Sequence, residues 1–240
     1  MDFQQINDLD QLLSRAGEKF EVVFEPVKIG DITLEILQIA DLDRYIEHLA
    51  ETSSERISLP LWSKIWPSSV LLSCQLLSMP GGGDSKTLLE LGAGVGLCGL
   101  CAASRGYRVT ISDNHEDSLL FARINILRNN LQDLARVKKV DFIKDELNES
   151  YDLVIGSEIL YLENYYPALV AFLKNHLRSG PDAQILLSAS SRRKSPAFFQ
   201  KAGQAFHISY KNVAYAPPSG DKMSSEESEQ VTIYRLKAKR

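Results

Sequence analysis

The sequence predicts an α/β fold built on a mainly parallel sheet, and three observations lead to this class. From residue 87 onward, short apolar runs of strand length alternate with longer segments of helical periodicity. The first of these runs, Leu88–Leu91, breaks directly into a turn with glycine at every second position, Gly92, Gly94 and Gly96. The composition, with 44% hydrophobic and 24% charged residues among 240, is that of a globular chain able to bury a large core.

Residues 1–58 are expected to form an extension that packs on the main domain, which spans 59–240. Apolar residues at helical spacing, and two β-rich runs around a Gly30-Asp31 turn, support this organisation. Asp41 is a candidate helix N-cap, because its carboxylate can accept hydrogen bonds from the first backbone N–H groups. The expected elements are a helix over 2–16, a hairpin of 20–27 and 32–39, and a helix from Asp41 to about Leu49.

In the main domain, a helix is predicted to start at Pro67, because proline is favoured in the first helical turn. Its apolar face is predicted to consist of Val70, Leu71, Cys74 and Leu77. Later helices are predicted over 116–129, 167–177 and 196–206. Strands are predicted over 107–112, 137–142, 151–155, 183–189, 207–215 and 229–237, with a polar loop over 216–228. Alternating strands and helices favour a parallel sheet with crossover connections.

The glycine turn is typical of a place where a nucleotide-type ligand approaches the backbone. Gly94-x-Gly96-x-x-Gly99 formally matches the dinucleotide fingerprint, but that match leaves Glu90 and Gly92 unexplained. The pattern Glu90-x-Gly92-x-Gly94-x-Gly96 accounts for all four residues. A carboxylate beside the turn suits a positively charged ligand and would repel a pyrophosphate. The turn therefore favours a cationic nucleoside ligand over a dinucleotide.

Two further strand ends carry acidic residues. Asp113 follows the next predicted strand, 19 residues beyond Gly94, where a carboxylate can accept hydrogen bonds from both ribose hydroxyls. Asp141 and Phe142 end the third strand, where a polar group and an aromatic face suit an adenine. Together with Glu90, they predict sites for a methionine-like zwitterion, a ribose and a base at one sheet edge. Taken singly, Glu90 could be a buried ion-paired acid, Asp113 a helix cap and Asp141 a solvated loop residue.

Residues 87–191 resemble class I S-adenosylmethionine-dependent methyltransferases, in the stretches LLELGAGVGLCGL, VTISDN, VDF and YDLVIGSEILY. The segment LWSKIWPSS is similar to the lysine-methyltransferase-like branch, methyltransferase family 16. The resemblance implies a Rossmann-like, seven-stranded, mainly parallel sheet with helices on both faces and an antiparallel last strand. The residues that it implies for binding S-adenosylmethionine are Trp66, Glu90, Gly92, Ala93, Gly94, Gly96, Asp113, Asn114, Asp141, Phe142 and Ser157.

The two tryptophans, and the residues that follow the fourth predicted strand of the main domain, each have two possible roles. From spacing alone, Trp62 and Trp66 are core anchors or lie over the cofactor, and members of the branch place the equivalent of Trp66 near the cofactor. The branch usually carries Asp-x-x-Tyr after the fourth strand, where this chain has Glu158 and Tyr161. We expect Glu158 to orient the acceptor amine and Tyr161 to line its channel. Alternatively, Glu158 caps a helix and Tyr161 packs on the sheet. Where the branch often has a tryptophan after the third strand, this chain has Phe142.

The net charge, the cysteines and the hydropathy of the sequence argue against nucleic-acid binding, metal binding and membrane insertion. A net charge of −4 argues against a protein that binds nucleic acid mainly by its charge. Cys98 and Cys101 form a CxxC without a second cysteine pair or a nearby histidine, so we expect small buried residues and no metal site. The polar N-terminal sequence does not read as a signal peptide, and no apolar run approaches membrane-spanning length. We expect a cytoplasmic monomer.

The predicted activity is methyl transfer from S-adenosylmethionine to a lysine side chain of a protein. The basic run Arg192-Arg193-Lys194 follows the fifth strand, and it is either a solvated loop or a contact for an acidic segment of the substrate. Three alternatives remain open at this point: a small-molecule methyltransferase, a cofactor-binding module without catalysis, and a dinucleotide-dependent oxidoreductase.

Overall fold

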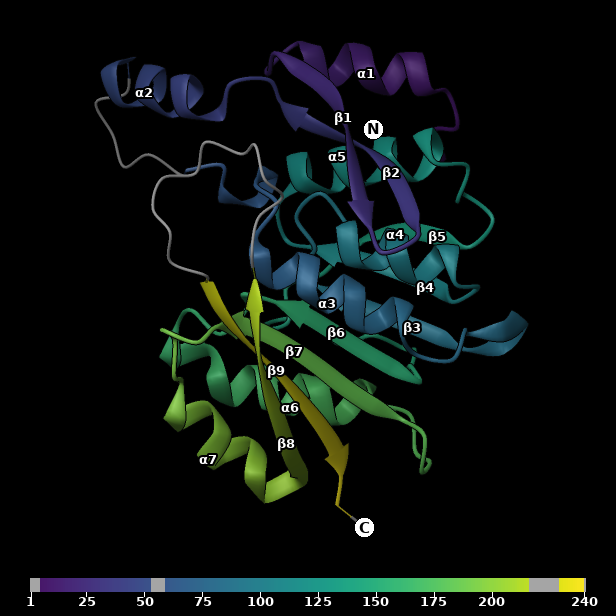
Figure 1. Ribbon diagram of the computed structural model, residues 1–240, viewed down its shortest axis with the longest axis vertical. Coiled ribbons are helices and arrows are strands. Elements are labelled where there is room, and N and C mark those ends of the chain that lie inside the picture. The colour runs from purple at the N-terminus through teal and green to yellow at the C-terminus, as the bar shows by residue number, and fades with distance from the viewer. Residues whose placement is uncertain (1–4, 53–58, 216–228, 240) are drawn as a thin grey trace.

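The computed structural model describes residues 5–52, 59–215 and 229–239, and a seven-stranded sheet forms the centre of this part of the chain (Figure 1). Its strands are β3 (Thr87–Leu91), β4 (Arg108–Asp113), β5 (Ala135–Lys139), β6 (Leu153–Ser157), β7 (Gln184–Ser190), β8 (Phe206–Tyr215) and β9 (Glu229–Ala238). The spatial order is β5-β4-β3-β6-β7-β9-β8. The five strands from β5 to β7 pair in parallel, whereas β9 runs antiparallel to both β7 and β8. The predicted sheet with an antiparallel last strand is confirmed.

Helices cover both faces of this sheet, as predicted. They are α3 (Pro67–Leu77), α4 (Leu97–Ser104), α5 (Glu116–Arg128), α6 (Tyr166–His176) and α7 (Pro196–Ala205). The first three helices share one cluster of buried side chains, and α6 and α7 share a second cluster. Because side chains alternate along a strand, Leu88 belongs to the first cluster and Leu89 to the second. The apolar runs of the central strands are continuous because both of their faces are buried.

The N-terminal residues form the predicted helix, hairpin and helix. These elements are α1 (Leu9–Gly17), β1 (Val22–Ile29), β2 (Ile32–Ile39) and α2 (Leu42–Thr52). The Asp8 carboxylate caps α1 and accepts from the Gln11 N–H at 3.1 Å, so this helix starts later than the predicted residue 2, and residues 1–4 lie outside the described part. Gly30, at φ +60°, makes the hairpin turn. Both α1 and β2 pack against α5.

Two local predictions are wrong. The third strand was expected over 137–142, but β5 ends at Lys139 because Asp141 starts a turn: its carboxylate accepts from the Ile143 N–H at 3.0 Å. The predicted apolar face of α3 is wrong in part: Val70, Leu71 and Leu77 pack against the first cluster but are only partly buried. The most buried residues of α3 are Ser68, Leu72, Ser73 and Leu76, and Cys74 is exposed. Small serines let α3 approach both α4 and β7, and the amphipathic pattern did not anticipate this two-sided packing.

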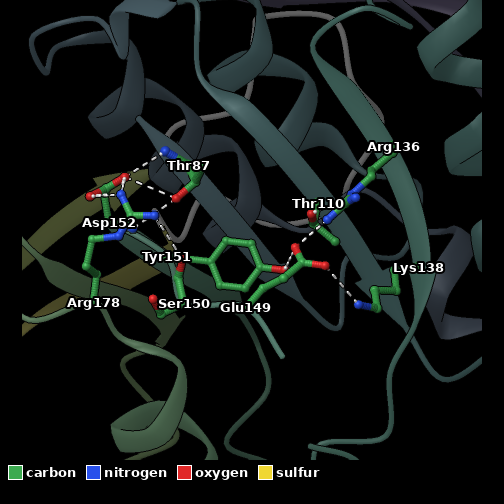
Figure 2. Close-up of polar contacts among 9 residues, drawn as sticks. All are labelled: Thr87, Thr110, Arg136, Lys138, Glu149, Ser150, Tyr151, Asp152 and Arg178. Atoms are coloured by element: carbon green, nitrogen blue, oxygen red, sulfur yellow. Dashed lines mark hydrogen bonds and ion pairs between the residues drawn. The ribbon is translucent and has the colours of Figure 1, made fainter. Parts of the chain in front are cut away.

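A polar network lies before β6 and beside the amino ends of the strands (Figure 2). Asp152 accepts hydrogen bonds from the Thr87 N–H at 2.8 Å, the Thr87 hydroxyl at 3.0 Å and the Arg178 guanidinium at 2.8 Å. Glu149 contacts Arg136, Lys138 and the Tyr151 hydroxyl. These contacts fix the segment that leads into β6. The Asp152 contacts lie at the amino end of β3, the opposite end of that strand from the glycine turn, so they support the fold.

Asp152→Asn is expected to lower the free energy of unfolding at pH 7 by about 2 kcal/mol, since it removes charge-assisted hydrogen bonds. Burial alone would raise the pKa of the Asp152 carboxyl, but the hydrogen bonds from Thr87 and the charge of Arg178 outweigh burial and hold the pKa below its ordinary value. The stabilisation is therefore present above the ordinary pKa and is lost as pH falls through the lowered value. Urea unfolding of wild type and variant at pH 7 and in acid measures this, and a pH-independent difference would contradict it.

Candidate functional site

The candidate site begins at the turn between β3 and α4. Gly92, Gly94 and Gly96 have φ values of +59°, +55° and +84°, in the left-handed region that favours glycine. A Cβ on Gly94 would lie only 2.5 Å from the Trp62 carbonyl oxygen. The Gly96 N–H donates to the Ala93 carbonyl at 2.9 Å and closes the turn. The spaced glycines are thus required by the backbone geometry of the turn.

Asp113, at the end of β4, holds this turn from the side. One of its carboxylate oxygens accepts from the Gly94 N–H at 3.0 Å, and the other accepts from the His115 N–H at 3.0 Å. Each carboxylate oxygen can accept a second hydrogen bond. Asp113 can therefore support the turn and still accept from a ligand hydroxyl. Asn114, the next residue, is exposed.

Two side chains of α5 hold the carbonyl groups of the same turn, and the sequence reasoning missed both. The Ser118 hydroxyl donates to the Gly94 carbonyl at 2.9 Å, and the Asn125 amide donates to the Val95 carbonyl at 3.0 Å. Both side chains are fully buried. The sequence signal that could have found them is two polar residues on the otherwise apolar face of the predicted helix over 116–129.

Glu90 is buried beneath α4, and its carboxylate accepts from the Gly99 N–H at 2.8 Å. A Cβ on Gly99 would lie 2.5 Å from the same carboxylate oxygen, which explains the glycine there. Burial raises the pKa of Glu90 to about 8, against the hydrogen bonds from Gly99 and Cys98 that favour its charged form. The predicted role of Glu90 beside a cationic ligand remains a prediction.

Asp141 and Phe142 lie just beyond β5. The Asp141 carboxylate accepts from the Ile143 N–H and pairs with Lys144 at 3.1 Å, and these two contacts, the backbone bond first, lower its pKa. Phe142 is partly buried against the second core cluster. The structure therefore gives both residues local packing partners. Their predicted role at an adenine remains a prediction.

The first turn of α3 lies at the carboxyl ends of β6 and β7. The Ser157 and Ser68 hydroxyls are 3.0 Å apart, and the Ser188 hydroxyl donates to the Ser68 carbonyl at 3.0 Å. Trp66, the N-cap residue of α3, is thereby placed at the same sheet edge as the glycine turn. The Trp66 indole N–H donates to the Leu61 carbonyl at 3.2 Å.

Trp62 has different surroundings from Trp66. Its ring lies 5.8 Å from the Phe20 ring and 5.0 Å from the Phe121 ring, and it stacks on His115 at 5.4 Å. Trp62 is therefore the core anchor, and its carbonyl also borders Gly94. The position of Trp66 near the cofactor stays a prediction.

Glu158 follows β6 in the left-handed region, at φ +56°, which is unusual for a residue with a Cβ and is often found at functional sites. Its backbone N–H donates to the Ser188 carbonyl at 2.8 Å. Its carboxylate accepts from the Ser190 N–H at 2.7 Å and lies 3.6 Å from the Arg193 guanidinium. The strained backbone and these contacts hold a carboxylate at the carboxyl end of β7.

Tyr161 brings the two halves of the candidate site together. The residue is 54% exposed, yet partial burial of its hydroxyl and the negative charges of Asp113 and Asp141 raise its pKa. The segment that carries Tyr161 adjoins the glycine turn, since a Cβ on Gly92 would lie 2.8 Å from the Ile159 side chain. An exposed phenol beside the site is suited to contact an incoming substrate.

The CxxC cysteines were the other candidate for reactive or metal-binding residues. Cys98 and Cys101 are free and buried, and burial raises the pKa of the Cys101 thiol to about 12, so neither is an activated nucleophile. The described residues contain no cluster of histidine, cysteine and acidic side chains that could hold a metal ion. Nor do they include a helix with the length and apolar character needed to cross a membrane.

The chain is similar to known lysine methyltransferases. A family model described as lysine methyltransferase matches residues 48–205. The chain is 36% identical to a protein N-lysine methyltransferase METTL21A of Danio rerio over 172 residues, 67% of this chain and 76% of that protein. It is 31% identical to EEF1A lysine methyltransferase 3 of Mus musculus, over 61% of this chain and 64% of that protein.

Solved structures support the fold alone. A putative RNA methyltransferase from Pyrococcus horikoshii superposes with a TM-score of 0.56 at 15% identity, over 82% of this chain and 98% of that one. The N-methyltransferase NodS from Bradyrhizobium japonicum, solved with S-adenosyl-L-homocysteine, superposes with a TM-score of 0.53 at 16% identity, over 70% of this chain and 86% of that one.

Proposed function

Because this chain belongs to the lysine methyltransferase family, we propose that it transfers a methyl group from S-adenosylmethionine to the side-chain amine of a lysine in a protein. One observation carries the proposal beyond family membership. The glycine turn follows β3 and the Glu158–Tyr161 segment follows β6, and these strands are parallel neighbours, so the two segments lie side by side at the carboxyl ends of the strands. A cofactor site and an acceptor site side by side are what a direct transfer between two substrates requires.

The residues at the turn fit S-adenosylmethionine. Asp113 retains acceptor capacity for ribose hydroxyls, and the buried Glu90 carboxyl suits a ligand that carries positive charge. Trp66, Ser157 and the turn itself would border the bound molecule. When bound, S-adenosylmethionine supplies an electrophilic methyl group on a cationic sulfur.

At the acceptor side, this chain has to hold a neutral amine in line and exclude water, and such positioning contributes on the order of 7–11 kcal/mol. A lysine amine has an ordinary pKa near ~10.4 and must lose its proton before attack. The Glu158 carboxylate would accept a hydrogen bond from the arriving ammonium and orient the amine afterwards. Tyr161 would line the entrance, where its exposed ring can contact the aliphatic part of the lysine side chain.

The exposed run Arg192–Lys194 supports a finer proposal about the substrate. Arg193 pairs with Glu158, so this basic loop adjoins the acceptor site. Its charge would favour a protein segment with acidic residues near the target lysine.

Transfer of labelled methyl from S-adenosylmethionine into a cell lysate tests the activity. We expect label that migrates with protein on a denaturing gel. Label confined to the small-molecule fraction would instead support a small-molecule methyltransferase. Cofactor binding without any transfer would support a non-catalytic module, and tighter binding of NAD than of S-adenosylmethionine would overturn the cofactor assignment.

Asp113→Ala is expected to raise the dissociation constant for S-adenosylmethionine at least about tenfold, because it removes the ribose acceptor and the partner of the Gly94 N–H. Isothermal titration calorimetry measures this change. Asp152→Asn is the matched control, since it removes a similarly hydrogen-bonded carboxylate at the other sheet edge and should leave the affinity unchanged. Equal weakening by both variants would contradict the assignment of Asp113.

A further inference from the structure

Two asparagines, Asn125 in α5 and Asn129 at its C-cap, form hydrogen bonds with the outer edge of β2. The Asn129 amide accepts from the Glu35 N–H at 3.0 Å and donates to the Glu35 carbonyl at 2.9 Å. One helical turn earlier, the Asn125 amide accepts from the Leu37 N–H at 2.7 Å. Within the described residues, β2 pairs along its other edge with β1, so these two side chains supply partners to outer-edge backbone groups, of which the Leu37 N–H is buried.

Asn125 differs from Asn129 in what its second amide group contacts. Its N–H donates to the Val95 carbonyl in the glycine turn at 3.0 Å, whereas Asn129 donates to Glu35 and to the Asn125 carbonyl. Asn125 is fully buried. One side chain thus joins the Leu37 N–H of the hairpin directly to the Val95 carbonyl of the turn.

The Val95 carbonyl belongs to the peptide that precedes Gly96, whose φ of +84° marks the start of α4. Fixing this carbonyl fixes the orientation of that peptide group, and with it the backbone that faces the ligand. The hairpin, Val22–Ile39, lies entirely outside the residues 48–205 that match the family model. The support for the turn therefore comes partly from a segment outside the matched region.

We propose that Asn125 is a positioning residue through which the β1–β2 hairpin sets the conformation of the cofactor-binding turn. The proposal rests on the proposed function in one respect, namely that the turn binds S-adenosylmethionine. Because the link is a pair of buried hydrogen bonds, cofactor binding and hairpin order are coupled in both directions.

The test compares Asn125→Ala with Asn129→Ala in the full chain. Both variants free backbone groups of β2, so both should lower the unfolding temperature, but only Asn125→Ala frees the Val95 carbonyl. We expect Asn125→Ala to raise the dissociation constant for S-adenosylmethionine about tenfold, and Asn129→Ala to leave it within about twofold. Calorimetry measures both. If Asn125→Ala does not fold, Asn125→Leu keeps the branched shape of the side chain without its hydrogen bonds and serves in its place.

Hydrogen exchange distinguishes a specific effect of Asn125 on the turn from a general loss of stability. Saturating S-adenosylmethionine should slow exchange of the Leu37 amide in the wild type and not in the Asn125 variant. The Glu35 amide, held by Asn129, is the internal control and should change little. Equal affinities of the two variants, or equal protection of Leu37 and Glu35, would overturn the proposal while leaving the methyltransferase assignment standing. A wild-type chain that does not bind S-adenosylmethionine would overturn both.

Discussion

Glu158→Gln is expected to lower the turnover number by about a hundredfold while the dissociation constant for S-adenosylmethionine stays within about twofold. Glutamine can still accept from the Ser190 N–H, so the loop after β6 keeps its support, but the charge that receives the lysine ammonium is lost. Steady-state methylation of an identified acceptor protein, together with calorimetry, measures the two quantities separately. The loss should fall on turnover because the interaction is made with the acceptor.

Glu158→Asp provides the conservative comparison, since the branch that this chain resembles usually carries aspartate there. It keeps the charge and shortens the reach by one methylene group, so it should recover much of the activity that glutamine loses. If Glu158→Gln weakened S-adenosylmethionine binding as strongly as Asp113→Ala, the separation of acceptor and cofactor roles would be wrong.

Glu90→Gln is expected to stabilise the cofactor-free protein at pH 9 by on the order of 3 kcal/mol, with almost no effect near pH 4. The buried Glu90 carboxyl has its pKa raised to about 8. Between pH 4.5 and 8 the unfolded chain releases this proton and the folded chain retains it, so wild-type stability falls as pH rises through that window. Glutamine has no proton to release. Urea unfolding at pH 4, 7 and 9 measures the difference.

Glu149→Gln is the matched control for Glu90→Gln, because the pKa of Glu149 is shifted in the opposite direction and its variant should show the opposite pH dependence of stability. Burial raises the pKa of Glu149, but the Tyr151 hydrogen bond and the charge of Arg136 outweigh burial and hold it low. Its variant should therefore lose stability relative to wild type as pH rises above the ordinary glutamate range. Above pH 8, where the wild-type carboxyl is ionised, the Glu90→Gln variant should also bind S-adenosylmethionine less tightly, because glutamine offers no negative charge. A stability difference that does not vary with pH would contradict the buried acid.

The sheet and the glycine turn were predictable because their signals are local. Apolar runs of strand length and glycines at alternate positions reflect backbone geometry within a few residues. The position of Glu90 could also have been refined from sequence, since alternation along β3 places its side chain on the Leu88 side, under α4. The two-sided burial of α3 could not be predicted, because it depends on how closely α4 and β7 approach.

The contacts of Asn125 show why the side chains that hold the glycine turn could not be predicted from the sequence. Its partners Leu37 and Val95 lie 88 and 30 residues away, so no spacing rule connects them. The left-handed backbone of Glu158 was equally invisible, because nothing in the residue type marks it. The sequence motif predicted the residues of the turn, and the structure was needed to show which side chains hold it.

Identification of the methylated amino acid tests the central claim most directly. A lysate is incubated with the protein and methyl-labelled S-adenosylmethionine, and the labelled proteins are digested and sequenced by mass spectrometry. The account predicts that the label resides on the side-chain nitrogen of lysine. Label on arginine or histidine, or label found only in small molecules, would contradict it.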